Sequence, residues 1–226
     1  MAQAIMETVF DVLYLTGVIT VGILLLRRAS SRNLLRMFGW MAVVLGVGDA
    51  FHLVPRMFAL WTTGLEANAV ALGVGKLITS ITMTAFYLLL FAIWQERYNA
   101  QGRKGLTVTV WALAIARVAL CLLPQNDWLA YRPALAFGIW RNIPFVIMGA
   151  MLIVLFAVEA RRAQDRVFRW MWLAVLLSFA FYIPVVLLGS EIPIIGMLMM
   201  PKTLAYVWIV WMGWNLQKEK TGRETA

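Results

Sequence analysis

The stretch RMFGWMAVVLGVGDAFHLVPRMFALW, residues 36–61, decides the fold class of this chain. Its apolar run, residues 37–60, is long enough to cross a bilayer as a helix, which takes about 20 apolar residues. The run also holds Asp49, His52 and Arg56. Ionisable groups at membrane depth usually face a bundle interior and mark function. We therefore expect a membrane-spanning helix that carries part of a polar site.

The composition of the whole chain is typical of a membrane protein. Of its 226 residues, 62% are hydrophobic, and the mean hydropathy is +0.80. A soluble domain of this size could not bury so much apolar surface. The formal net charge of +9 comes from short basic clusters between apolar runs. This distribution predicts a lipid bilayer as partner and no nucleic acid.

Seven apolar runs predict an all-α membrane bundle of seven transmembrane helices. We expect one membrane domain over residues 1–217 and a cytoplasmic tail over residues 218–226. The runs cover residues 3–26, 37–60, 68–94, 106–123, 142–159, 168–188 and 193–215.

The basic residues predict how the bundle is oriented. Of the 20 lysines and arginines, 14 follow the first, third, fifth and seventh runs. The opposite connections hold chiefly Glu66, Asp127, Arg132 and Glu191. The positive-inside rule then places the N-terminus outside the plasma membrane and the C-terminus in the cytoplasm. The 14 residues are Arg27, Arg28, Arg32, Arg36, Arg97, Arg103, Lys104, Arg161, Arg162, Arg166, Arg169, Lys218, Lys220 and Arg223.

Residues 36–52 and 166–182 suggest an internal repeat, because RMFGWMAVVLGVGDAFH aligns without gaps on RVFRWMWLAVLLSFAFY. Spans 1–3 would then repeat as spans 5–7, a 3+1+3 parallel arrangement found in some transporters. The alternative is a chance alignment of apolar helices with aromatic ends. The halves would be residues 1–94 and 142–217, with the linker helix at 106–123.

Span 2 places Asp49, His52 and Arg56 on one helix face, at positions i, i+3 and i+7. Pro55 frees a backbone carbonyl nearby. His52 is the only histidine and can change charge near neutral pH. Beside Asp49 it is a candidate proton relay or general base. The alternative is a histidine that only forms a hydrogen bond to a neighbouring helix.

Asp49 and Lys76 are expected at similar depth on neighbouring antiparallel helices, roughly 18 Å and roughly 15 Å from the outer ends of their spans. Each follows the same string, LGVG, at residues 45–48 and 72–75. Small residues let helix backbones approach closely. We expect an ion pair between the two, serving either a site or only as a structural clamp.

Other spans add polar groups to this set. Glu7 and Asp11 line one face of span 1 together with Tyr14, and two acids one turn apart in lipid imply water, a cation or basic partners. Lys202 follows Pro201 near the middle of span 7. The expected ligand-binding residues are Glu7, Asp11, Asp49, His52, Arg56, Lys76, Arg117, Tyr182, Lys202 and Tyr206.

Some of these polar residues also have simpler explanations. Arg117, Arg141 and Asn142 are expected near the outer ends of spans 4 and 5, where snorkelling or phosphate contact explains an arginine. The hydroxyl residues of span 3 could line a solute path or merely bond to their own helix. They are Thr79, Ser80, Thr82 and Thr84.

The ionisable set outside the cytoplasmic clusters has an excess of two positive charges with His52 neutral. It contains Glu7, Asp11 and Asp49 against Arg56, Lys76, Arg117, Arg141 and Lys202. This predicts a polar cavity, open to the outside and suited to a carboxylate, a phosphate or a lipid headgroup.

We expect no metal and no cofactor. One histidine and a few acids give no HExxH or multiple-histidine pattern. A lysine in a seventh helix, Lys202, could suggest a retinal Schiff base, but span 3 offers no carboxylate counter-ion.

Three strings resemble an uncharacterised family of bacterial multi-pass membrane proteins: GDAFHLVPR (48–56), LPQNDW (123–128) and PKTLAYVWIV (201–210). Gly48 and Asp49 also resemble, weakly, the Gly-Asp of an early span in YhhN-type lysoplasmalogenases, which implies hydrolysis of a lipid vinyl ether. The 3+1+3 plan is similar to that of PQ-loop and SWEET-like transporters. Pro124 and Gln125 lie beyond span 4, away from the position of that family's motif.

Two main functional hypotheses follow from these observations. The first is a transporter or ligand-binding membrane protein for a small anionic or zwitterionic solute or a lipid headgroup, which could assemble as a homo-oligomer. The second is a membrane-embedded lipid hydrolase in which Asp49 and His52 act as acid and base. A third, a sensor or scaffold, has no soluble output domain in its favour.

Overall fold

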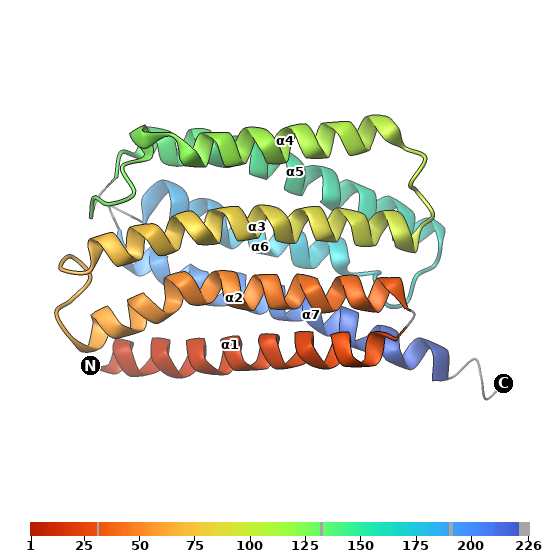
Figure 1. The fold of residues 1–226 in the computed structure, drawn as a ribbon, viewed down its shortest axis with the longest axis horizontal. Helices are drawn as coiled ribbons and strands as arrows, with labels where there is room; N and C mark the ends of the chain where they lie inside the picture. The colour runs from red at the N-terminus through yellow and green to blue at the C-terminus, as the bar shows by residue number, and fades with distance from the viewer. Residues whose placement is uncertain (31, 132, 190–191, 222–226) are drawn as a thin grey trace.

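The computed structural model describes residues 1–30, 32–131, 133–189 and 192–221 (Figure 1). In this part of the chain every regular element is a helix, and seven helices are long and apolar enough to cross a membrane, which confirms the predicted all-α class with seven helices of membrane-spanning length. Arg132, Glu191 and Arg223, and the side chains of Lys218 and Lys220, lie outside the described part. The elements are α1 (Ala2–Ala29), α2 (Asn33–Trp61), α3 (Ala69–Arg97), α4 (Lys104–Leu122), η1 (Pro124–Asn126), α5 (Leu135–Arg162), α6 (Met171–Leu188), η2 (Pro193–Leu198) and α7 (Met199–Thr221).

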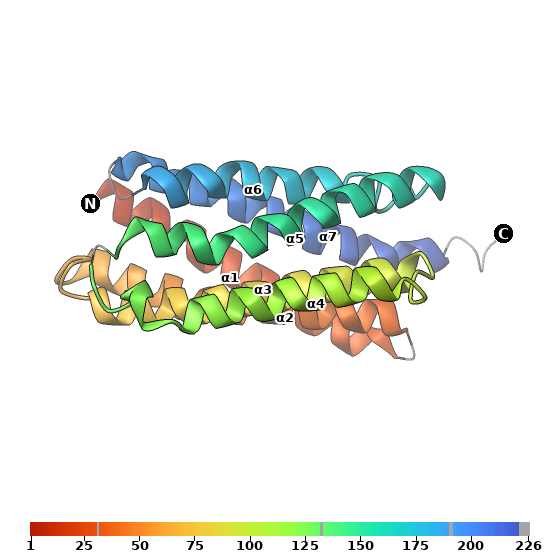
Figure 2. The ribbon, with the colours of Figure 1, turned by 90° about the horizontal axis from the view of Figure 1, so that it is seen from above.

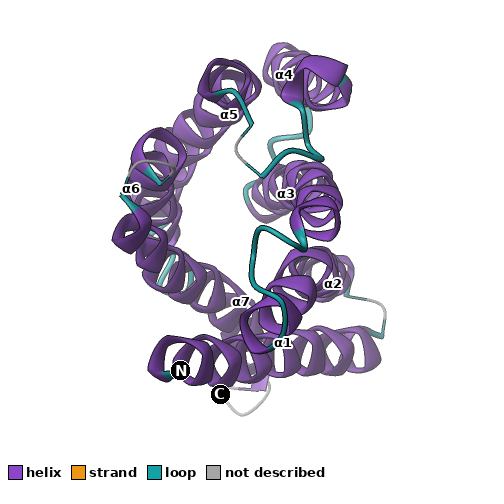
Figure 3. Cartoon of the chain, turned by 90° about the vertical axis from the view of Figure 1, so that its left-hand side faces the viewer, coloured by secondary structure: helices purple, strands orange, loops and turns teal. Residues whose placement is uncertain are grey.

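The helices lie side by side in one elongated bundle (Figure 2). The N-terminus lies at one end, called here the N end, and α7 finishes at the other, the C end. Viewed along the bundle, α2 to α4 form one side and α5 to α7 form the other, while α1 runs across the bottom of the view (Figure 3). Helix α7 also packs against α1 and α2, so the first and last spans share an interior.

Aromatic side chains fill the C-end half of this interior. Phe38, Trp94, Phe156 and Phe168 are fully buried there, and the ring centroids of Phe38 and Phe168 are 5.5 Å apart. Trp40 and many other large apolar side chains lie exposed on the outer surface, as expected where lipid is the solvent. The C-end half is therefore tightly packed.

Helices α2 and α3 approach closely at the two LGVG strings, as predicted. A Cβ atom at Gly75 would meet the Phe51 carbonyl oxygen, and one at Gly48 would meet the Thr82 side chain. Thr79 Oγ1 donates a hydrogen bond to the Gly48 carbonyl at 2.9 Å. These contacts set the register of the two helices, with residue 75 beside residue 51 and residue 82 beside residue 48.

Two helix boundaries differ from the prediction in ways that affect the site. Helix α5 begins at Leu135 rather than at residue 142, so Arg141 and Asn142 lie inside it. The charge of Arg141 suggested a span end, whereas Pro133 followed by an apolar run is the better start signal. Helix α7 continues to Thr221, into the segment expected to be a tail.

Candidate functional site

Helices α1 and α2 are joined by polar contacts in the N-end half of the bundle. Arg56 donates hydrogen bonds to Glu7, from Nε to Oε2 at 2.9 Å and from Nη2 to Oε1 at 3.2 Å. Tyr14 donates to Oδ2 of Asp49 at 2.7 Å. The i, i+7 spacing of Glu7 and Tyr14 places both on the face of α1 that meets α2. The predicted polar face of span 1 therefore has two specific partners on span 2.

Asp11 lies on the same face of α1, between Glu7 and Tyr14. Its exposed fraction is only 7%, and no hydrogen bond or ion pair to it occurs among the described residues. Glu7, Arg56 and Asp49 are all within electrostatic range of its carboxylate. Asp11 is thus a buried acid without a direct partner.

The expected ion pair between Asp49 and Lys76 is wrong. Asp49 is bound by Tyr14, and the Lys76 side chain is exposed, with no hydrogen bond or ion pair within the described ranges. The α2–α3 register explains the error, since residue 76 lies opposite the region of His52, about one turn nearer the N end than Asp49. Lys76 instead lies within electrostatic range of Arg56 and Arg141.

Among the described residues, no carboxylate contacts His52. Its Nδ1 atom is buried without a hydrogen-bond partner in the described part of the chain, and the carboxylate of Asp49 binds Tyr14 instead. The cations nearest in electrostatic effect are Lys76, Arg56 and Lys202. The geometry therefore contains no direct Asp49–His52 acid–base pair.

Arg117 of α4 points into the bundle rather than toward a headgroup layer. It is 2% exposed, and its Cζ atom lies 3.3 Å from the centroid of the Phe145 ring. Its Nε and Nη1 atoms have no hydrogen-bond partner among the residues that the structure describes. Tyr182 and Tyr206 are within its electrostatic range. Snorkelling does not explain such an arginine, because snorkelling would carry the guanidinium out to water.

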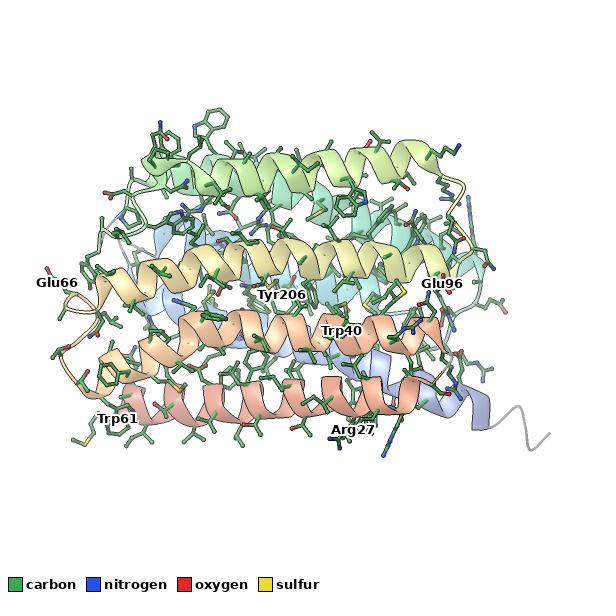
Figure 4. The ribbon with its side chains drawn as sticks, viewed as in Figure 1. Arg27, Trp40, Trp61, Glu66, Glu96 and Tyr206 are labelled. Atoms are coloured by element: carbon green, nitrogen blue, oxygen red, sulfur yellow. The ribbon has the colours of Figure 1, made fainter. Side chains whose placement is uncertain are left out.

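Lys202 of α7 lies close to the same region. It is 8% exposed, and its Nζ atom is 4.5 Å from the ring centroid of Tyr182 and 5.4 Å from that of Tyr206. The Asp49 charge attracts the ammonium group, and the Arg117 charge repels it. Tyr206 itself lies within the bundle (Figure 4). The predicted residues Arg117, Tyr182, Lys202 and Tyr206 are therefore gathered in one region.

Arg141 and Asn142 support this region from α5. The Arg141 Cζ atom lies 4.1 Å from the ring centroid of Trp128, and Nη1 donates to Asn126 Oδ1 at 2.8 Å. Tyr182 donates its hydroxyl proton to Asn142 Oδ1 at 3.0 Å. Sequence analysis underrated both residues because it placed them at a span end.

Two further buried groups, Tyr87 and Ser178, were missed by sequence analysis. Their hydroxyl oxygens are 3.1 Å apart, so α3 and α6 are bridged beside the aromatic contacts of Phe145. The serine in the apolar run LLSFAFY was the available signal. The hydroxyls of Ser80 and Thr84 bond to carbonyls of their own helix, which favours the simpler explanation given for them above.

A second polar cluster lies at the C end. Arg97 donates to Asp165 at 2.8 Å and to both carboxylate oxygens of Glu219 at 2.9 and 2.8 Å. Asp165 also accepts from Tyr98 and from the backbone N–H groups of Val167 and Phe168. This cluster ties the end of α3 to the α5–α6 connection and to α7.

The hydrogen bonds of this cluster change the acidity of its members. Burial by itself would raise the pKa of Asp165, but the hydrogen bonds from Arg97 and the Phe168 N–H outweigh burial and hold that pKa below its usual 3.8. Burial and the neighbouring Asp165 charge raise the pKa of Tyr98. Asp165 is therefore an anion and Tyr98 a neutral donor at neutral pH.

An apolar groove of about 400 Å³ lies between α3 and α4 and is lined by residues such as Ile81, Leu88, Trp111 and Ile115. It contains none of the predicted ligand-binding residues. Within the described residues, no group of three or more histidine, cysteine, aspartate or glutamate side chains is placed to hold a metal ion. Comparison of the chain with protein-family models, with curated proteins and with solved structures finds no match.

Proposed function

We propose that this protein is an integral membrane transporter or ligand-binding protein whose ligand carries an anionic group, held between Arg117 and Lys202. The observation that carries the proposal is the Arg117 guanidinium, 2% exposed with two nitrogen atoms unpartnered within the described chain. A buried, unpaired charge costs several kcal/mol, and such a cost is usually offset by a partner. The planar fork of an arginine fits a carboxylate or a phosphate.

Lys202 strengthens this assignment. Two cations that repel each other inside a bundle would both gain from an anion placed between them. Tyr182, next to Lys202 and bonded to Asn142, offers an aromatic wall for the ligand. The hydrolase alternative gains no comparable support, because Asp49 binds Tyr14 and does not contact His52.

Anion binding is tested on the purified protein in dodecyl maltoside. Inorganic phosphate, sulfate, acetate and succinate are titrated, and the melting temperature is measured. We expect at least one of these anions to raise the melting temperature, and Arg117→Gln to weaken its binding at least tenfold. Arg103→Gln is the matched control, because Arg103 pairs with Glu159 at the C end.

Two outcomes would reject the site. One is that no anion of the panel stabilises the protein at tens of millimolar; the other is that Arg117→Gln binds like the unmodified protein. Transport is read from uptake of the bound anion into phosphatidylcholine vesicles. Lys202→Ala should abolish that uptake.

We also propose that the N end faces outside, because the basic connections gather at the C end. A green fluorescent protein fused to the C-terminus should fluoresce in the cytoplasm, and an alkaline phosphatase fused there should be inactive. An active phosphatase would show that the C-terminus lies outside the cytoplasm, the opposite of the proposed orientation.

We also propose that spans 1–3 and spans 5–7 are repeats of one another. The aligned residues Phe38 and Phe168 are both fully buried and contact each other, as equivalent residues near a two-fold axis would. The aligned Trp40 and Trp170 are both exposed.

A further inference from the structure

A pocket of about 220 Å³ lies at the C end, where α5 leads into α6. Three of the residues that line it are exposed arginines, Arg161, Arg166 and Arg169. Within the described ranges, their guanidinium groups form no hydrogen bond and no ion pair. The Cζ atom of Arg169 lies 5.0 Å from the ring centroid of Trp170. Three cations around one hollow repel one another, and an anion between them would relieve that repulsion.

The acid that lines the same pocket, Asp165, does not neutralise these arginines. Its Oδ2 atom accepts hydrogen bonds from Arg97 and Tyr98, and its Oδ1 atom accepts from the backbone N–H groups of Val167 and Phe168. The Asp165 side chain is only 2% exposed. The mouth of the pocket therefore presents an excess of positive charge.

Backbone hydrogen bonds fix the shape of the connection that forms the pocket. The N–H group of Asp165 donates to the Ala160 carbonyl at 2.9 Å, and that of Gln164 donates to the Arg161 carbonyl at 3.2 Å. Gln164 has a φ of 48°, in the left-handed region. These features end α5 by folding the chain back over its last turn. The arginines on either side of the fold are thereby held around one hollow before any ligand binds, which lowers the cost of binding.

Apolar surface of the kind that contacts lipid adjoins the pocket. Val154 and Val158 are exposed on the face of α5 that leads to Arg161, at positions i, i+4 and i+7. Leu176 is exposed on α6, and Trp170 is exposed at its start. Tryptophan rings favour the headgroup layer of a bilayer. An anion in the pocket would therefore lie beside surfaces that acyl chains cover.

We propose that this pocket binds the phosphate group of an anionic phospholipid, whose acyl chains lie along the exposed apolar faces of α5 and α6. The arginine fork fits a phosphate, and basic pockets at the ends of transmembrane helices suit anionic headgroups. The positive-inside rule by itself explains basic residues at this end, but it does not require that they surround a pocket. The inference goes beyond the function proposed for Arg117 and does not depend on it.

Native mass spectrometry of the protein in micelles, titrated with phosphatidylglycerol or phosphatidylcholine, tests the site. We expect phosphatidylglycerol to bind about fivefold or more tightly, since one arginine at a membrane surface contributes about 1 kcal/mol. The double variant Arg166→Gln/Arg169→Gln should lose this preference. The matched control is Arg27→Gln/Arg36→Gln, which removes the same charge at the same end of the bundle, where Arg27 points outward (Figure 4).

The control variant should keep the preference for phosphatidylglycerol. An equal loss in both double variants would show that general basic charge attracts the lipid, and it would overturn the pocket. Equal affinity of the unmodified protein for the two lipids would overturn it as well. If the pocket variant melts more than a few degrees lower without lipid, Arg161→Gln takes its place, and unchanged binding there rejects the site.

Two further measurements separate this site from other sources of anion binding. Glycerol 1-phosphate, which lacks acyl chains, should bind far more weakly than phosphatidylglycerol, and equal affinity would overturn a lipid as the ligand. Arg117→Gln should keep the preference for phosphatidylglycerol, even where it removes binding of a soluble anion. Loss of that preference in Arg117→Gln alone would place the lipid at the interior site and overturn the inference.

Discussion

The C-end cluster and the N-end interior use the same kinds of side chain in opposite ways. At the C end, the Arg97 guanidinium binds two carboxylates, and the side chain of Asp165, which is 2% exposed, has four donors. In the N-end half, Arg117 stacks on an aromatic ring but has no carboxylate partner, and Asp11 has no cation in direct contact within the described residues. Satisfied charges hold a fold together, and unsatisfied ones indicate a place for a ligand.

Replacing Arg97 or Arg117 with methionine tests the difference between the two regions with the largest expected effect. Arg97→Met should lower the free energy of unfolding by about 2–3 kcal/mol, because it leaves Asp165 and Glu219 without their cation. That figure is lower than for a fully buried pair because Arg97 is 21% exposed. Thermal or denaturant unfolding in micelles measures it.

The same exchange at Arg117 should have the opposite sign. Without ligand, Arg117→Met removes an unpaired buried charge and should stabilise the protein by about 1 kcal/mol, after the loss of its contact with Phe145 is included. Destabilisation at both positions would show that Arg117 is structural, like Arg97. An unchanged free energy of unfolding in both variants would show that the two regions do not differ in this way.

Acid pH gives the smallest effect and sharpens the comparison at the C end. Asp165 has a lowered pKa in the folded protein, so its stabilising contribution is complete above its ordinary pKa of 3.8 and is lost as the pH falls through the lower folded value. The free energy of unfolding should therefore fall on acidification below about pH 4. In Asp165→Asn this part of the decline should be missing. An identical pH profile for the two proteins would contradict the role given to Asp165.

Long, strongly patterned segments were predictable from the sequence. The seven spans follow from apolar runs alone, and the α1 face of Glu7 and Tyr14 follows from helical spacing. The LGVG strings correctly indicated a close α2–α3 contact. Each of these predictions was made from a pattern within a single segment.

Partners across helices were not predictable in the same way. Asp49 and Lys76 share the same preceding string, but the register that Gly75 and Gly48 impose separates them. Arg141 was misplaced because a charge near an apolar run looks like a span end, while its contact with Asn126 depends on how the α4–α5 connection folds back.

The sequence by itself determined that the chain is a bundle of membrane-length helices with ionisable groups inside it, because hydrophobicity and helical period are properties of each segment. Only the tertiary structure decided which charges are paired and which are left unpaired. That outcome depends on the rotation and axial register of each helix against its neighbours, which the packing of glycines, aromatic rings and connections sets for the bundle as a whole.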